Sequence, residues 1–165
     1  MKKLLFLLIM FMVTINISAQ ESNESAAQKI ESLQLKLDKL QHEYDYFYCE
    51  TVLKQIANEL SIQSNNINNK SNGMLINIYH SAYDPDLYRL YKETYDADIE
   101  NLNSHESYIN VTKIRISQII EKSNFTEREI EILEHSYSLV ISSFNAVKKA
   151  SNYYKVVLDM YKNNR

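Results

Sequence analysis

The most informative stretch of the chain is residues 126–162, which read TEREIEILEHSYSLVISSFNAVKKASNYYKVVLDMYK. Thr126 followed by Glu129 is a capping-box pattern, which predicts that a helix begins at about residue 127 and runs to about residue 162. Beyond it, apolar side chains recur at alternating steps of three and four residues, the a/d spacing of a helix that packs along its whole length. The positions of this stripe are Ile130, Leu133, Tyr137, Val140, Phe144, Val147, Ser151, Tyr154, Leu158 and Tyr161.

A second long helix is predicted upstream of this stretch. Asp84 is a good N-cap and Pro85 is tolerated in a first helical turn, so the helix begins there. Apolar residues from Leu87 to Ile120 continue the pattern, and the helix ends near residues 123–124. At 1.5 Å rise per residue, each long helix measures on the order of 50 Å.

The first helix of the mature chain carries two successive stripes. A change of stripe within one helix re-aims its buried face. Residues 61–72 are rich in Asn and Ser and end at Gly73, which predicts a loop or a frayed helix end. A short helix over residues 74–83 follows. The first stripe comprises Ile30, Leu33, Leu37, Leu40, Tyr44 and Phe47, and the second Cys49, Leu53, Ile56 and Leu60.

These patterns predict an all-α fold, an elongated antiparallel helical bundle of three long helices plus one short helix. The composition agrees, because 165 residues include one glycine, one proline and one cysteine. So few turn-forming residues exclude phosphate-binding glycine loops and many-stranded β folds. A single cysteine excludes a disulfide framework and a cysteine-rich zinc site.

Residues 1–19 have the layout of a secretory signal peptide, with Lys2 and Lys3 ahead of an apolar run and Ala19 before the expected cleavage point. Residues 20–165 then form a single helical-bundle domain, exported to a bacterial periplasm or the extracellular space and without a stable membrane anchor. Loss of the two lysines takes the net charge from −3 to −5, which is the wrong sign for a nucleic-acid partner.

No residue pattern predicts catalysis, a metal or a cofactor. Each histidine has an oxygen-bearing side chain one helical turn away. The Glu-x-x-His spacing of di-iron bundles and the His-Glu-x-x-His pattern of zinc proteases are both absent from the sequence, so a structural role is favoured for the histidines. Cys49 lies on an apolar stripe and is expected to be buried, the alternative being a thiol that bridges two chains. We therefore expect a protein that is not an enzyme. The histidine pairs are Asp38–His42, His80–Asp84, Asn101–His105 and Glu131–His135.

Tyrosine is unusually frequent, with 13 residues, and it is clustered. Tyr44, Tyr46 and Tyr48 cannot all face one core from one helix, and tyrosine is common at protein interfaces. These three residues are the candidate partner-binding site. For a second cluster, between residues 79 and 95, core packing is favoured.

Residues 124–138, NFTEREIEILEHSYS, resemble a stretch in exported helical proteins encoded by conjugative elements of Bacteroidetes. Those proteins look like periplasmic, minor-pilin-type components of a type IV secretion apparatus. The resemblance implies a scaffolding or adhesive role in DNA transfer, with no catalysis.

The leading hypothesis is an exported, non-enzymatic helical protein that acts through protein–protein contacts, and the resemblance implies that these contacts lie within a conjugation or secretion assembly. The partner is an unidentified protein, and a homo-oligomer is left open. The alternative is a periplasmic holdase-type chaperone that binds unfolded clients. A third hypothesis, a bundle that binds a metal or a small ligand, is the least favoured.

Overall fold

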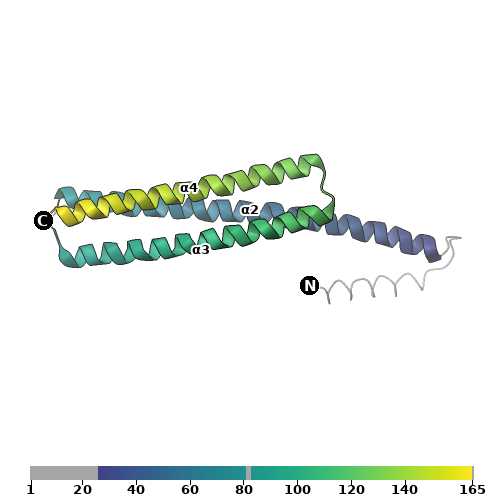
Figure 1. Cartoon of the computed structure of the whole chain (residues 1–165), viewed down its shortest axis with the longest axis horizontal. Helices are drawn as coiled ribbons and strands as arrows, with labels where there is room; N and C mark the ends of the chain where they lie inside the picture. Colours follow the sequence, from purple (N-terminus) through teal and green to yellow (C-terminus); the bar gives the residue numbers. More distant parts are fainter. Residues whose placement is uncertain (1–25, 81–82, 165) are drawn as a thin grey trace. The chain divides into compact units, whose positions relative to one another are not determined.

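The computed structural model of the chain describes residues 26–80 and 83–164, and this part is helical throughout apart from short connections (Figure 1). It contains α2 (Ala26–His80), α3 (Pro85–Ser123) and α4 (Glu127–Asn163), and no strand. The expected all-α class is confirmed. The chain divides into two compact units, residues 1–39 and residues 40–165, with α2 contributing to both.

The expected signal peptide, residues 1–19, lies outside the described residues. Within the part that is described, no helix combines the length and the apolar composition needed to cross a membrane.

Helix α2 runs without a break through the segment where a loop was expected. Residues 61–72 are helical. The prediction of a separate short helix over residues 74–83 is wrong, because residues 74–80 are the end of α2. The apolar spacing explains the difference, since Leu60, Ile67 and Met74 recur every seven residues and are all fully buried. Buried Ser71 fits between them because its hydroxyl donates to the Ile67 carbonyl at 2.9 Å. Tertiary packing here outweighs the weak helix propensity of Asn and Ser.

Both other helices begin where the sequence predicts. The Asp84 carboxylate accepts hydrogen bonds from the backbone N–H groups of Asp86 and Leu87, and Pro85 occupies the first turn of α3. Thr126 and Glu129 form the complete capping box at the start of α4. Asn124 ends α3 in the left-handed region with a φ of 46°, a conformation that Asn tolerates better than most residues.

The core of residues 40–164 contains the predicted stripe of α4. Eight of its ten positions are buried, and Ile130 and Tyr137 are partly buried against the same cluster. The early part of α3 contacts the late part of α4, with the Tyr95 and Tyr154 rings 5.7 Å apart. Further along, the Lys148 ammonium lies 3.0 Å from the Glu106 carboxylate. The buried residues of the stripe are Leu133, Val140, Phe144, Val147, Ser151, Tyr154, Leu158 and Tyr161.

Candidate protein-binding face

Residues 40–50 of α2 have two opposite faces. Cys49 is fully buried in the core and Tyr46 packs against it, whereas Leu40, Tyr44 and Phe47 are 58%, 48% and 65% exposed. At 3.6 residues per turn the two sets lie about half a turn apart on the helix. The inner face therefore holds α2 in the core, and we call Leu40, Tyr44 and Phe47 the outer face.

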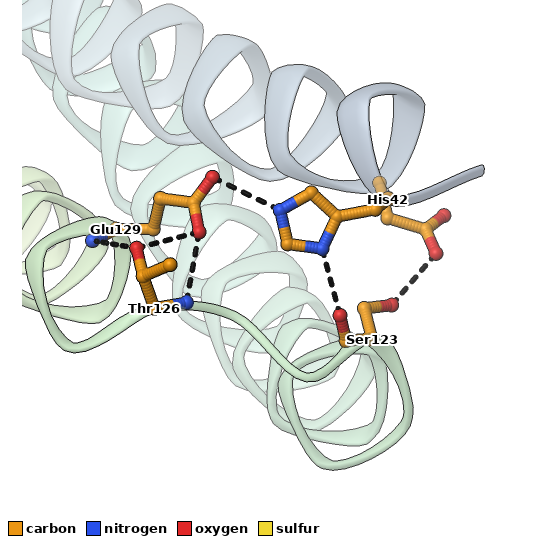
Figure 2. A network of polar contacts seen from close by, with 5 residues as sticks. His42, Ser123, Thr126 and Glu129 are labelled. Atoms are coloured by element: carbon orange, nitrogen blue, oxygen red, sulfur yellow. Dashed lines mark hydrogen bonds and ion pairs between the residues drawn. The ribbon is translucent and has the colours of Figure 1, made fainter. Parts of the chain in front are cut away.

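The inner face holds the connection between α3 and α4 through a polar network (Figure 2). His42 Nδ1 lies 2.8 Å from the Ser123 carbonyl oxygen, and His42 Nε2 lies 3.0 Å from Glu129 Oε1. The Ser123 hydroxyl donates to Asp45 Oδ2 at 2.7 Å. Glu129 also accepts from the Thr126 N–H at 2.8 Å, so one carboxylate caps α4 and binds α2.

This network favours the charged form of His42. A carbonyl oxygen and a carboxylate can only accept, so both ring nitrogens must carry a proton to satisfy them. The hydrogen bond to the Ser123 carbonyl, followed by that to Glu129, raises the pKa of His42 above its usual 6.5. The hydrogen bonds from Thr126, and then the one from His42, lower the pKa of Glu129 below 4.5.

Aromatic packing completes the inner face. Phe125, 8% exposed, places its ring 5.2 Å from that of His42 and 5.9 Å from that of Tyr46, with near-perpendicular planes in both pairs. Cys49 is 0% exposed, so its expected burial is confirmed. Burial raises the pKa of the Cys49 thiol to about 11, which leaves little thiolate near neutral pH.

The outer face corrects the expectation that the first stripe of α2 is buried. Leu40, Tyr44 and Phe47 are all exposed, and so are Ile30 and Leu33 earlier in the same stripe. Only the second stripe, which includes Cys49, enters the core. The spacing predicted a helix with a continuous apolar stripe, but it did not reveal that the described part of the chain leaves that stripe uncovered.

The three tyrosines of the candidate site do not share one environment. Tyr44 and Tyr48 are one turn apart, and their rings stack with centroids 6.5 Å apart. The Arg115 guanidinium lies 4.9 Å from the Tyr48 ring centroid, a cation–π contact that fixes this side of α2 to α3. Tyr46 instead points to Phe125 on the inner face. Tyr44 therefore belongs to the outer face, Tyr48 flanks it, and Tyr46 is a packing residue.

Asp98 and His105 form structural contacts beside an open groove. Buried Asp98 is bound by the Lys70 ammonium at 2.9 Å, next to an open polar groove of about 370 Å³ lined in part by Glu59 and His105. The His105 ring donates to the Asn101 carbonyl at 2.8 Å. Among the described residues, no three His, Cys, Asp or Glu side chains converge as a metal site would require.

Sequence reasoning missed two parts of this face. His42 was paired with Asp38 on its own helix, whereas its partners are Ser123 and Glu129, more than 80 residues away. Phe47 was assigned to the buried stripe, whereas it is the most exposed residue of the outer face. A signal in the sequence could have found them. The second stripe can be extended backwards from Leu53 at steps of four and three, through Cys49 and Tyr46 to His42, so it begins before the first stripe ends at Phe47.

Comparisons with known proteins give no relative. No protein-family model matches the chain, and neither a curated protein nor a solved structure is detectably similar to it.

Proposed function

We propose that this protein is an exported, non-enzymatic helical protein that acts by binding another protein through the outer face of α2. The observation that carries the proposal is the exposure of Leu40, Tyr44 and Phe47 on the side of the helix opposite the core. Apolar and aromatic side chains at a/d spacing are the usual contact set for a second helix.

The geometry of the inner face supports a rigid binding helix. His42 and Asp45 hold α2 to Ser123, and Phe125 packs between the His42 and Tyr46 rings. Because these contacts fix the backbone of α2, only the side chains of the outer face lose conformational freedom on binding. The protein partner therefore meets a preorganised surface.

The proposal includes an antiparallel bundle for residues 40–163. His42 near the start of this unit meets Ser123 at the end of α3, whereas Lys70 later in α2 meets Asp98 earlier in α3. Tyr154 late in α4 donates to the Tyr91 carbonyl early in α3. These pairings support neighbouring helices of alternating direction, which present long side-by-side faces.

Export and a role in conjugation belong to the proposal on sequence grounds alone. Export rests on the layout of residues 1–19, and the conjugation assignment rests on the resemblance of residues 124–138. In that stretch Thr126 and Glu129 act as a helix cap. A run of conjugation genes beside the gene for this protein would support the conjugation role.

Affinity capture tests the binding proposal. A tagged chain is expressed in the cells that make it, with a Leu40→Ser/Phe47→Ser variant and a Tyr79→Ser control. Tyr79 is a matched residue, since it is also an exposed aromatic on α2, at 76%. The outer-face variant should lose its captured protein while the control retains it. Equal recovery from all three chains would contradict the proposal.

The holdase alternative is favoured by a different observation, the exposure of apolar side chains on all three helices. Ile62 on α2, Val111 on α3 and Val156 on α4 are each more than half exposed. A holdase would suppress aggregation of many unrelated unfolded proteins, and the outer-face variant would suppress it as well as the unaltered chain. Suppression that depends on Leu40 and Phe47 would argue for the single face.

A further inference from the structure

The outer face belongs to a longer stripe on one continuous helix, α2 (Ala26–His80). Six residues of this stripe occupy successive a and d positions, and we call them the α2 seam. Four are at least 48% exposed, Leu33 is 37% exposed and Leu37 is partly exposed. The seam residues are Ile30, Leu33, Leu37, Leu40, Tyr44 and Phe47.

We propose that the α2 seam binds the seam of a second copy of this chain, with the two helices antiparallel. This inference rests on the proposed function and names the partner of that face. The seam is self-complementary in size and in charge when the second helix runs in the opposite direction.

Antiparallel pairing centred between residues 38 and 39 matches every seam residue with another. In this register an a residue of one copy shares a layer with a d residue of the other. Ile30 then faces Phe47, Leu33 faces Tyr44, and Leu37 faces Leu40, and each layer occurs twice by symmetry. Both aromatic residues are opposed by aliphatic ones, which keeps the volume of successive layers similar.

The flanking charges are complementary in the same register. The g positions carry Lys29, Lys36, Glu43 and Glu50, and antiparallel helices bring g positions together. Lys36 meets Glu43 of the second copy, and Lys29 meets Glu50, which already binds Lys54 of its own chain at 2.8 Å. On the other flank, the e positions bring Gln34 to Gln41. Each amide already donates one N–H to a carboxylate of its own helix, Gln34 to Asp38 at 2.9 Å and Gln41 to Asp45 at 2.8 Å, and keeps a second N–H and a carbonyl oxygen for the other amide.

A parallel pair has none of these advantages. Phe47 would face Phe47 and Tyr44 would face Tyr44, and the lysines at g would meet Gln34 and Gln41 at e, without an ion pair. The core contacts of residues 42–49 leave the seam accessible in either case, since His42, Tyr46 and Cys49 lie on the inner face. Charge and size therefore select the antiparallel direction.

Sedimentation equilibrium of the exported, purified chain tests the pairing. The chain should be a dimer, and Lys36→Glu should raise its dissociation constant by about tenfold, because two attractive pairs become repulsive. Lys36→Glu/Glu43→Lys restores opposite charges and should return the constant to near its original value. The control, Lys149→Glu, reverses an exposed charge on α4 and should change nothing.

Cysteine cross-linking tests the direction. Ile30→Cys and Phe47→Cys chains, carrying tags of different mass, are mixed and oxidised. Antiparallel pairing predicts a disulfide between the two different variants and almost none between identical ones, whose cysteines would lie about 25 Å apart at 1.5 Å per residue. Helical content and melting temperature of each variant, measured alongside, show that the variants fold.

Three results would overturn the inference. They are a chain that is monomeric at all concentrations, a dimer that the charge pair does not affect, and disulfides between identical variants only. The unaltered chain could instead be monomeric and capture a different protein, which the Leu40→Ser/Phe47→Ser variant fails to capture. That result would overturn this inference while supporting the proposed function. If the Leu40→Ser/Phe47→Ser variant kept both the dimer and the captured protein, the result would contradict both this inference and the proposed function.

Discussion

His42 links three helical segments through one side chain. Its two ring nitrogens reach the last residue of α3 and the capping glutamate of α4, so its protonation state affects how firmly the α3–α4 connection is held to α2. The imidazolium satisfies both acceptors, and the neutral ring satisfies only one. The residue is therefore a source of pH-dependent stability in this part of the chain.

We predict that the contribution of His42 to stability falls as the pH rises. The folded-state pKa lies above 6.5, so the stabilisation is complete below 6.5 and is lost as the pH rises through the raised value. Glu129 has a lowered pKa, so its contribution is present above 4.5 and is lost as the pH falls through the lowered value. The interaction is thus strongest between 4.5 and 6.5.

Thermal melts of the unaltered chain and His42→Gln check this prediction. The difference in unfolding free energy should be about 1 kcal/mol or less, as for partly exposed ion pairs, and larger at about pH 5.5 than at about pH 8.5. A difference that grows at alkaline pH would show that the charged form is not the one that binds.

Cys49 should be chemically inert in the folded chain. Its thiol is fully buried and its pKa is raised to about 11. A thiol reagent can therefore react with Cys49 only after this part of the chain unfolds locally. We predict that labelling by a chromogenic disulfide at about pH 8 is at least about a hundredfold slower than in the denatured chain. Labelling at the denatured rate would mean that the inner face of α2 is not packed.

At the scale of elements, the sequence predicted α3 and α4 closely because each carries its own end signals. Asp84 with Pro85, and Thr126 with Glu129, act within a few residues of the helix starts that they form. Helix α2 was predicted less well, because residues 61–72 have no strong local preference and become helical through the burial of Ile67 and its neighbours. Local signals can be read from sequence, whereas the effect of tertiary burial cannot.

The same distinction explains the candidate site. Tyr44 and Phe47 were visible as members of an apolar stripe, but spacing gives only the face of a helix and not what covers that face. His42 and Glu129 are 87 residues apart, so no local pattern could join them. Their contact depends on where the connection after Ser123 meets α2.

Gly73 provides a test of the continuous α2 helix. Its backbone has no positive φ, and a Cβ atom placed on it would have nothing within 4 Å. Gly73→Ala should therefore raise the unfolding free energy by about 0.5–1 kcal/mol, the usual gain within a helix.

Urea denaturation with fluorescence of the tyrosines as the signal measures this change. Gly73→Pro serves as the opposite control and should cost about 3 kcal/mol or more in a helix interior. If residues 61–73 formed a loop instead, neither substitution would have these effects.

At the scale of the whole molecule, the residues that stabilise the fold differ from the residues proposed to bind a partner. Tyr154 is 1% exposed, donates to the Tyr91 carbonyl and packs against Tyr95, so Tyr154→Ala should lower the unfolding free energy by about 3–5 kcal/mol. Phe47 is 65% exposed, so Phe47→Ser should change the stability of the isolated chain by about 0.5 kcal/mol or less. Denaturation curves at a concentration where the chain is monomeric check both values.

Photo-cross-linking inside the producing cells shows whether the outer face of α2 is a protein-binding surface. A photoreactive phenylalanine replaces Phe47 in one chain and Tyr79, a more exposed aromatic of the same helix, in another. The account predicts a discrete protein adduct from position 47 and none from position 79. No adduct at position 47, or the same adducts from both positions, would contradict it.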